Sequence, residues 1–371
     1  MMNPRFPAFE ALLLATVLFV ASCGASAAVI VTCTGGKQLS TAIAKAMTTA
    51  KPGALIEFRV TGSCVDDLVI PLGVKIYLNG IGTAATGGYG ASLQPATTSA
   101  SALKAFGGWA QVDNFYIKGK LGSNAFDVVE VNASGFLQIT NSKVVATGSQ
   151  QGVGVFSTAQ IANSVIVGEQ GSAIMVAANG YLSIYADDGK TTTVSSTGAG
   201  TGNAIGCYLG AINAWTNRTG DGYAGSSGIL TIGPAHHGID ARGCRAQLGL
   251  DSKEGSVRIT ANMVGVRAVG ADIFNLKGVS VSDNTLTGME VSAGVIEIDN
   301  STISKPTSTA VGLSARRGGV IYFNNFVGPS RVAWTGANTN FYECRQGGHI
   351  YGETGNPTGG ASTSGCLEIE P

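Results

Sequence analysis

A short unit, made of two alternating apolar runs joined by a small-residue corner, repeats along most of this chain. Two copies stand in tandem between residues 288 and 327, and each closes on an asparagine, Asn300 or Asn325. Alternation with a period of two predicts half-buried strands, and glycine or asparagine between the runs predicts sharp corners. Tandem units of this length are typical of solenoids. The unit starts at Ala102, Ala125, Gly152, Ala173, Ala204, Gly238, Gly265, Gly288 and Ala310.

The closing asparagine recurs through the repeats. Asparagine tolerates the left-handed conformation of a corner and can bond to an asparagine stacked on the next coil. We therefore interpret the periodic asparagines as a ladder of turns rather than as catalytic groups. They are Asn114, Asn141, Asn163, Asn275, Asn300 and Asn325.

This coil pattern and its asparagine ladder resemble the right-handed parallel β-helix proteins of the pectate-lyase-like superfamily, over roughly Val29 to Phe326. The resemblance implies an all-β chain folded as a single-stranded right-handed parallel β-helix. It does not extend to one family within that fold. His237-Gly238 matches part of the Gly-His-Gly of polygalacturonases, but the Asn-Thr-Asp, paired Asp and Arg-Ile-Lys elements are absent, as is the Asp-Pro-His of alginate epimerases.

The first 27 residues have the pattern of an export signal: Arg5, an apolar run from Ala11 to Val20, and a small-residue cleavage site. An alternative is a lipobox in which Cys23 is lipidated. We expect secretion or display at the cell surface, with the periplasm also open. Residues 28–371 are predicted to form one β-helix domain, with an N-terminal cap over 29–64, coils over 65–327 and a disulfide-closed tail over 328–371.

One helix is predicted, over residues 38–50. Leu39, Ile43, Ala46 and Met47 form one apolar face, and Pro52-Gly53 ends it. Because the open end of a β-helix exposes unpaired strand edges, we expect this helix to cover that end as a cap.

Six cysteines remain once Cys23 is set aside, and an even number in an exported chain favours disulfides. Nearest-neighbour pairing is one of several connectivities. It would join Cys33 to Cys64, Cys207 to Cys244 and Cys344 to Cys366. For the middle pair two buried thiols are the alternative, since Cys207 aligns with Ala241 rather than with Cys244.

Composition excludes one class of partner. Charged residues are 12% of the chain, the formal net charge is zero, and no basic run occurs, so nucleic acid is not an expected partner. The apolar run near the N-terminus is too short to span a bilayer. The oligomeric state is left open.

Outward positions of successive units align into two columns. Asp240, Arg267 and Glu290 fall on adjacent coils of the first column and predict a stack of alternating charge, which a solvated surface ladder would also give. The first column is Lys104, Asp127, Gly154, Met175, Gly206, Asp240, Arg267, Glu290 and Gly312; the second is Phe106, Val129, Phe156, Ala177, Tyr208, Arg242, Val269, Ser292 and Ser314.

The longest interval between units, 204–238, leads into this charged column and is rich in aromatic and cationic residues. Aromatic faces suit sugar rings, and arginine suits a uronate carboxylate. Asp240, Arg242, Arg267 and His237 are therefore the candidate catalytic residues. The candidate substrate-binding residues are Tyr208, Trp215, Arg218, Tyr223, Arg245 and Glu290.

A metal site is not expected. His236 and His237 are adjacent, so in a strand they should point to opposite faces. Calcium is the alternative, at the acidic turns Asp66-Asp67 and Asp187-Asp188-Gly189, but neither has EF-hand or RTX spacing. We expect no metal and no cofactor.

Two functions fit this pattern. The first is an exported protein that binds an extracellular acidic polysaccharide and cleaves it by β-elimination, with arginines neutralising the developing enolate. Hydrolysis would instead need two carboxylates, and Arg267 is predicted to lie between Asp240 and Glu290. The second is a structural or adhesive surface module without catalysis, favoured by the missing catalytic motifs and the sparse charge.

Overall fold

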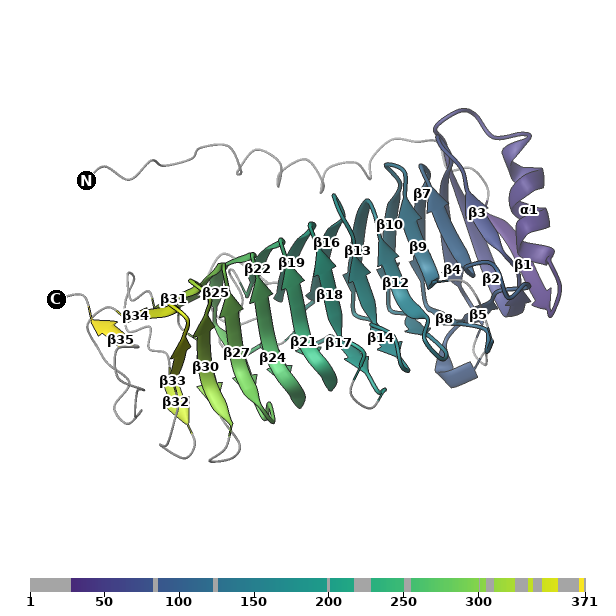
Figure 1. The fold of residues 1–371 in the computed structure, drawn as a ribbon. Coiled ribbons are helices and arrows are strands. Elements are labelled where there is room, and N and C mark those ends of the chain that lie inside the picture. The colour runs from purple at the N-terminus through teal and green to yellow at the C-terminus, as the bar shows by residue number, and fades with distance from the viewer. Residues whose placement is uncertain are drawn as a thin grey trace.

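The computed structural model describes residues 28–82, 86–122, 126–198, 201–216, 228–249, 255–299, 301–304, 310–323, 333–335, 342–352 and 367–369. The chain winds into a parallel β-helix whose coils stack from the end that carries the helix α1 to the opposite, C-terminal end (Figure 1). All strand pairings are parallel, and most coils supply one strand to an eleven-stranded sheet and two strands to a second sheet. The predicted export signal, residues 1–27, lies outside the described residues.

The eleven-stranded sheet, here called sheet B, contains every third strand of the chain. Its strands are β3 (Leu68–Ile70), β6 (Leu103–Phe106), β9 (Asp127–Asn132), β12 (Gln151–Val155), β15 (Ile174–Val176), β18 (Ile205–Tyr208), β21 (Ala235–Arg242), β24 (Asn262–Val269), β27 (Thr287–Ser292), β30 (Val311–Arg316) and β33 (Tyr342–Arg345).

The second sheet, sheet A, forms two rows that meet in β1 (Val29–Thr34) and the long β2 (Leu55–Val65). Row A1 follows sheet B along the chain and comprises β4 (Lys75–Gly80), β7 (Trp109–Asp113), β10 (Phe136–Thr140), β13 (Thr158–Ala162), β16 (Tyr181–Ala186), β19 (Ala211–Thr216), β22 (Arg245–Leu248), β25 (Asp272–Lys277), β28 (Val295–Asp299), β31 (Val320–Phe323), β34 (His349–Gly352) and β35 (Leu367–Ile369). Row A2 comprises β5 (Ala91–Gln94), β8 (Phe115–Lys118), β11 (Lys143–Val145), β14 (Val165–Gly168), β17 (Thr191–Ser196), β20 (Ile229–Ile232), β23 (Val257–Thr260), β26 (Val279–Ser282), β29 (Thr302–Ser304) and β32 (Ala333–Thr335). A short 3-10 turn, η1, spans Thr86–Gly88.

Inward Val, Ile, Leu and Ala side chains stack from coil to coil and form one continuous core. The corner residue just before the first regular inward residue of a sheet B strand is small in most coils, because it packs against the backbone of the next coil. A Cβ at Gly265 would lie 2.5 Å from the carbonyl oxygen of Gly288 and 3.0 Å from a methyl group of Val281. Close approach of backbone from the next coil therefore accounts for the recurring Gly or Ala at the start of the unit.

Register confirms seven of the nine predicted unit starts and corrects two. Val129 of β9 lies opposite Val153, and Leu313 of β30 lies opposite Met289. The corner positions are therefore Val128 and Gly312, not Ala125 and Ala310. Both errors came from choosing the first small residue in a stretch that offers several, whereas the inward apolar residue sets the register.

The asparagine corners are confirmed at three positions. Asn114, Asn141 and Asn163 have φ of 58°, 46° and 53° between rows A1 and A2. At the Asn275 coil the prediction is wrong: β25 continues to Lys277 through a register irregularity, and Gly278 takes the left-handed position with φ 66°. Asn300 and Asn325 lie outside the described residues.

At these three described corners the asparagine side chains bond to other groups rather than to one another. Asn141 Nδ2 donates to Asp113 Oδ1 at 2.7 Å, and Asn163 Nδ2 donates to Asp187 Oδ2 at 2.6 Å. The ladder is made by the serine that follows the asparagine: Ser164 Oγ accepts from Ser142 N at 3.1 Å, and Ser142 Oγ accepts from Phe115 N at 3.0 Å. These serines are buried, so each hydroxyl satisfies a backbone amide at a tight corner.

The helix α1 (Gln38–Met47) covers the N-terminal end as predicted, with Leu39 and Ile43 buried and Ala46 and Met47 packed against the core. It ends three residues before the predicted Ala50. The amides of Thr48 and Thr49 bond to carbonyls three residues back, and their hydroxyls donate to the same Lys45 and Ala46 oxygens, so the last turn tightens.

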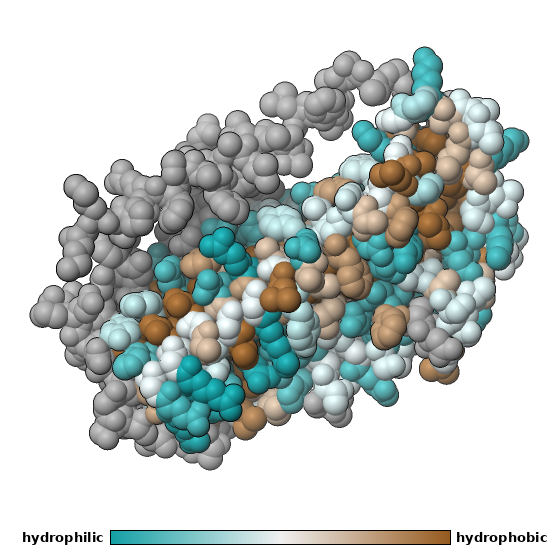
Figure 2. Space-filling model, turned by 45° about the horizontal axis from the view of Figure 1, so that its top comes forward, coloured by the Kyte–Doolittle hydropathy of each residue, from teal (hydrophilic) through white to brown (hydrophobic). Residues whose placement is uncertain are grey.

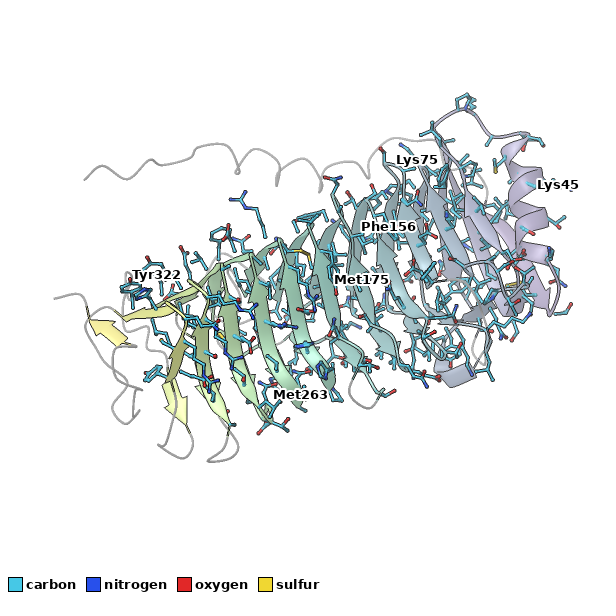
Figure 3. All side chains as sticks on the ribbon, in the orientation of Figure 1. Lys45, Lys75, Phe156, Met175, Met263 and Tyr322 are labelled. Carbon is cyan, nitrogen blue, oxygen red and sulfur yellow. A yellow bond between two sulfur atoms is a disulfide. The ribbon has the colours of Figure 1, made fainter. Side chains whose placement is uncertain are left out.

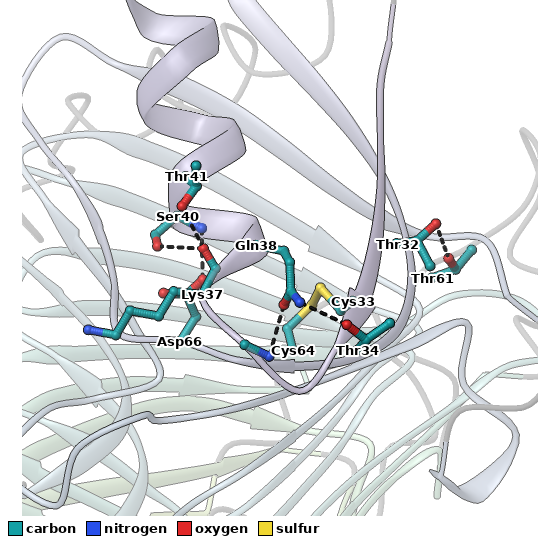
Figure 4. The surroundings of a disulfide bond; sticks show 11 residues. Thr32, Cys33, Thr34, Lys37, Gln38, Ser40, Thr41, Thr61, Cys64 and Asp66 are labelled. Atoms are coloured by element: carbon teal, nitrogen blue, oxygen red, sulfur yellow. Dashed lines mark hydrogen bonds between the residues drawn. A yellow bond between two sulfur atoms is a disulfide. The ribbon is translucent and has the colours of Figure 1, made fainter.

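Two of the predicted disulfides are present. Cys33 joins Cys64 with 4.9 Å between Cα atoms, next to the start of α1, where Asp66 Oδ2 accepts a hydrogen bond from Ser40 N (Figure 4). Cys207 joins Cys244 with 6.2 Å between Cα atoms, and Cys207 lies opposite Ala241 as predicted. The third predicted pair includes Cys366, which lies outside the described residues.

Candidate functional site

Sheet B presents three columns of outward side chains along the helix axis. The first two columns are three residues apart in each strand, because a small corner residue and one inward residue lie between them, as in His237-Gly238-Ile239-Asp240. The third column follows two residues later. Column 1 contains Asp127, Gln151, Ser172, Asn203, His237, Val264, Thr287 and Val311; column 2 contains Lys104, Glu130, Gly154, Met175, Gly206, Asp240, Arg267, Glu290, Ser314 and Glu343; column 3 contains Phe106, Asn132, Phe156, Ala177, Tyr208, Arg242, Val269, Ser292, Arg316 and Arg345.

These columns correct two coils of the predicted ones. Glu130 and Asn132 stand where Asp127 and Val129 were predicted, and Ser314 and Arg316 stand where Gly312 and Ser314 were predicted. The cause is the same misplacement of the two unit starts.

Arg267 lies where its alignment predicted. It is opposite Asp240 on one side and Glu290 on the other, and Val266 is fully buried beside Ile239 and Met289. Arg267 Nε lies 3.9 Å from Glu290 Oε1, which is the one ion pair that the described residues give it. With a third of its side chain exposed, the guanidinium keeps donors for a ligand.

Asp240 is covered rather than solvated. Its side chain is 1% exposed, and Arg242 from the same strand binds it, with Nη2 at 3.0 Å and Nε at 3.2 Å from Oδ2. Arg242 in turn lies over the ring of Tyr208, with Cζ 5.3 Å from the ring centroid. Three predicted residues therefore form one contact chain at the centre of sheet B.

The C-terminal half of this face holds further arginines. Arg316 Nη2 lies 2.9 Å from Glu343 Oε2, and Arg316 Nη1 lies 3.7 Å from Glu290 Oε2. Arg345 also pairs with Glu343. Burial alone raises the pKa of Glu343, but the hydrogen bond and charge of Arg316, helped by Arg345, hold that pKa below its ordinary value. From Asp240 to Arg345, four arginines face three carboxylates, so this stretch is weakly cationic and its guanidinium groups are held in place.

His237 lies next to Asp240 and is almost fully buried. Burial lowers the pKa of His237 to about 4, while the charge of Asp240 opposes this and Arg267 and Arg242 add to it. Nδ1 lies 2.8 Å from Asn203 Oδ1. With that amide oxygen as acceptor, Nδ1 carries the proton and Nε2 is the basic atom of a neutral ring.

The two adjacent histidines do not point to opposite faces. Their ring centroids are 4.3 Å apart in an edge-to-face contact. Both residues precede the corner at Gly238, where the regular alternation of the strand has not yet begun, so the sequence argument from alternation failed here.

The N-terminal half of the face is apolar and acidic. Phe106 and Phe156 are about half exposed, and Lys104 pairs with Glu130 at 2.9 Å. The carboxyl group of Asp127 lies over Gly154, where a Cβ would clash with it. Burial, with the nearby charge of Glu130, raises the pKa of Asp127 to about 7.

Hydropathy divides the surface in a similar way. Figure 2 shows a large hydrophobic patch toward the end that carries α1 and a group of hydrophilic side chains toward the C-terminal end. Figure 3 places Phe156 and Met175 on the outer side of sheet B, between these two regions.

Several predicted binding residues do not join this site. Trp215 lies in β19 of sheet A and stacks on Tyr185, with 4.9 Å between ring centroids. Arg245 lies in β22, also in sheet A, with its cation over Phe274. The interval 204–238 contains an ordinary coil, β18 to β20, and residues 217–227 between β19 and β20 lie outside the described residues. Arg218 and Tyr223 lie outside the described residues.

The acidic turns bind protein groups. Asp67 Oδ1 accepts from the amides of Ala96 and Thr97 at 2.8 and 3.2 Å, and Asp187 bonds to Asn163. Within the described ranges no three His, Cys, Asp or Glu side chains form a group that could hold a metal ion. The described residues include no helix long and apolar enough to cross a membrane.

Five charged residues of this face were missed from the sequence: Asp127 as a buried carboxyl, Glu130 as the partner of Lys104, and then Arg316, Glu343 and Arg345 in the C-terminal half. Arg316, Glu343 and Arg345 can be assigned to this face from the sequence only when the register of their strands is known.

No protein-family model and no characterised protein sequence matches the chain. Among solved structures, an alginate lyase from Paenibacillus sp. str. FPU-7 is similar to 91% of this chain and 98% of its own, with 12% identity and a TM-score of 0.32. The gp42 tailspike of Acinetobacter phage vb_AbaP_AS12 is similar to 82% of this chain and 56% of its own, with 10% identity and a TM-score of 0.36. At these TM-scores neither likeness carries an argument about function.

Proposed function

We propose that this protein is exported and binds an extracellular acidic polysaccharide along the outer face of sheet B. The observation that carries the proposal is a set of four arginines on the C-terminal half of that face, with Arg267 in column 2 and Arg242, Arg316 and Arg345 in column 3. Coils about 4.8 Å apart set these cations at intervals that a linear polyanion can follow.

The carboxylates between the arginines favour selective binding over nonspecific attraction of any polyanion. Asp240, Glu290 and Glu343 hold the guanidinium groups in fixed orientations, and each arginine keeps exposed donors for a uronate carboxylate. The same carboxylates can accept hydrogen bonds from sugar hydroxyls. Phe106, Phe156 and Tyr208 continue column 3 toward α1 and give apolar contact to sugar rings.

β-Elimination is the reaction for which this face holds suitable groups. A neutral His237 can accept the proton α to the uronate carboxylate, and Arg267 and Arg242 can neutralise the enolate. The enolate then collapses to a carbon–carbon double bond, the C–O bond to the leaving sugar breaks, and the glycosidic oxygen takes a proton from water. Hydrolysis by Asp240 and Glu290 is not favoured, because Arg267 stands between them and Asp240 is covered by Arg242.

The test is binding of alginate and polygalacturonate at increasing salt, followed by the ultraviolet absorbance of the unsaturated product. We expect Arg316→Gln to weaken binding about tenfold. Arg258→Gln, which removes an exposed arginine of row A2, serves as the control and should bind as the wild type does. Failure of every polyuronate to bind would overturn the proposal. Binding without a change in absorbance would refute elimination and support the adhesive module.

If the absorbance does rise, His237→Asn should abolish turnover while polysaccharide binding is retained. Equal loss of both would assign His237 to the fold rather than to proton transfer.

A further inference from the structure

Row A1 carries a second set of aligned polar side chains, on a different face from the arginines. Gln111 lies opposite Gln138, Gln138 opposite Gln160, and the same position continues through the next three coils. We call this set the amide row. It consists of Gln111, Gln138, Gln160, Ser183, Asn213 and Gln247.

The amide row is not used to hold the fold together. Within the part of the chain that the structure describes, its glutamine and asparagine side chains make no hydrogen bond to protein, although they are half-buried. Ser183, at its centre, is 2% exposed, and its Oγ is buried without a partner. Because the fold does not use these amides, their donors and acceptors remain available to a ligand.

Aromatic side chains flank the amide row on both sides. Trp109 stacks on Phe136 with 5.8 Å between ring centroids, and Tyr185 stacks on Trp215 with 4.9 Å. Tyr181 extends the first side and is 40% exposed. The two stacked pairs and Tyr181 therefore border the row.

The charge on this face differs from that on sheet B. Strands β7, β10, β13, β16 and β19 each present three outward positions, and Asp113 is the one charged residue among them. Asp113 Oδ1 already accepts from Thr140 Oγ1 and Asn141 Nδ2, each at 2.7 Å. Along these five strands the face therefore has no cation to attract a polyuronate and no free carboxylate to attract a cationic partner. Lys75 of β4 and Arg245 of β22 are the cations at its two ends.

We infer that this face binds an uncharged polysaccharide that lies along the helix axis. Side-chain amides can both donate to and accept from sugar hydroxyls, and the aromatic side chains offer apolar contact to the sugar rings. The coil spacing of about 4.8 Å is close to the length of one sugar residue in an extended chain, so successive sugars can meet successive coils. This surface is separate from the proposed acidic site, and the protein would join two kinds of glycan.

Affinity electrophoresis with galactomannan and xyloglucan as probes, and alginate as the acidic comparison, tests the inference. We expect at least one neutral glycan to retard the wild-type protein, and Gln138→Ala with Gln160→Ala to weaken that binding about tenfold. Gln94→Ala removes an exposed amide of row A2 and should change nothing. Binding of alginate should be the same in all three proteins, which separates this face from sheet B.

Ser183→Ala gives a second measurement, in a variant that is expected to fold as stably as the wild type. Without glycan, its melting temperature should equal or exceed that of the wild type, because an unpartnered hydroxyl is removed. Its neutral-glycan affinity should match that of the wild type, because the buried hydroxyl has no exposed surface with which to contact a ligand. The inference is overturned if neither neutral glycan binds the wild type, or if the double glutamine variant binds as well as the wild type. It is also overturned if that variant alters the oligomeric state, since the face would then be a contact between copies of the chain.

Discussion

Asp240 and Arg267 stand opposite each other on adjacent strands, yet Asp240 takes its ion pair from Arg242 of its own strand. Arg267 is left with a 3.9 Å contact to Glu290. An arginine that faces a carboxylate without binding it contributes little to stability and remains able to hold a ligand. The proposed site therefore predicts that Arg267 matters for binding, whereas a surface charge ladder predicts that it does not.

Arg267→Ala should therefore separate stability from binding. We expect the free energy of unfolding to change by less than about 1 kcal/mol. Binding of a polyuronate should weaken by about 1.5–3 kcal/mol, the range for a charge-assisted hydrogen bond. Denaturation and titration calorimetry measure the two effects. Arg245→Ala removes the same charge from sheet A and should leave binding unchanged; equal effects of both variants would contradict a site on sheet B.

Arg242→Ala should behave differently, because Asp240 is 1% exposed and would lose its cation. We expect a cost of about 1–3 kcal/mol, below the value for fully buried pairs since Arg242 itself is 44% exposed. Adding Asp240→Asn should restore part of that loss in urea unfolding. Arg345→Ala, at a more exposed pair, should cost under about 1 kcal/mol, and a similar cost for both arginines would show that Asp240 does not need its partner.

The fold was predictable because the repeated sequence pattern specifies both the strands and the corners between them. Alternating apolar residues fix the inward face, and small residues mark the corners, as at Gly265, where no Cβ fits. The one helix and the pair Cys33–Cys64 followed from an apolar face and from position in the chain.

The site was only partly predictable. Asp240, Arg242, Arg267 and Glu290 come together on sheet B because their coils align without ambiguity. Trp215 and Arg245 were misplaced because a long interval was interpreted as an insertion beside the site, when most of it is an ordinary coil. Burial was not predictable either: Asp240 and Asp127 occupy outward positions, and their neighbours cover them.

Asp127→Asn should change how stability depends on pH. The pKa of Asp127 rises from an ordinary 3.8 to about 7 on folding, so the folded chain holds a proton that the unfolded chain loses between those values. That stabilisation is present at low pH and is lost as pH rises toward 7, by at most about 4 kcal/mol. Asparagine stays neutral, so the variant should gain stability relative to the wild type from pH 4 to pH 8. If the melting temperatures of the two proteins instead changed with pH in parallel, the raised pKa of Asp127 would be contradicted.

His237 has the opposite effect over nearly the same pH range. Its pKa falls from an ordinary 6.5 to about 4 on folding, so the unfolded chain binds the extra proton and stability is lost as pH falls from about 6.5 to 4. In the wild type this loss offsets the effect of Asp127, because one group binds a proton on folding where the other releases one. The two residues together should leave stability nearly flat between pH 4 and pH 6.5.

Single substitutions should reveal how each residue alone makes stability depend on pH. His237→Gln removes the acid-side loss, so stability should fall as pH rises, by at most about 3 kcal/mol, through the remaining effect of Asp127. Asp127→Asn should give the reverse slope through the remaining effect of His237. Combining both substitutions should restore a flat profile, since neither proton is then exchanged on folding. Urea unfolding at pH 4, 5 and 6.5 measures all four proteins, and two single variants that slope in the same direction would show that one of the pKa shifts has the wrong sign.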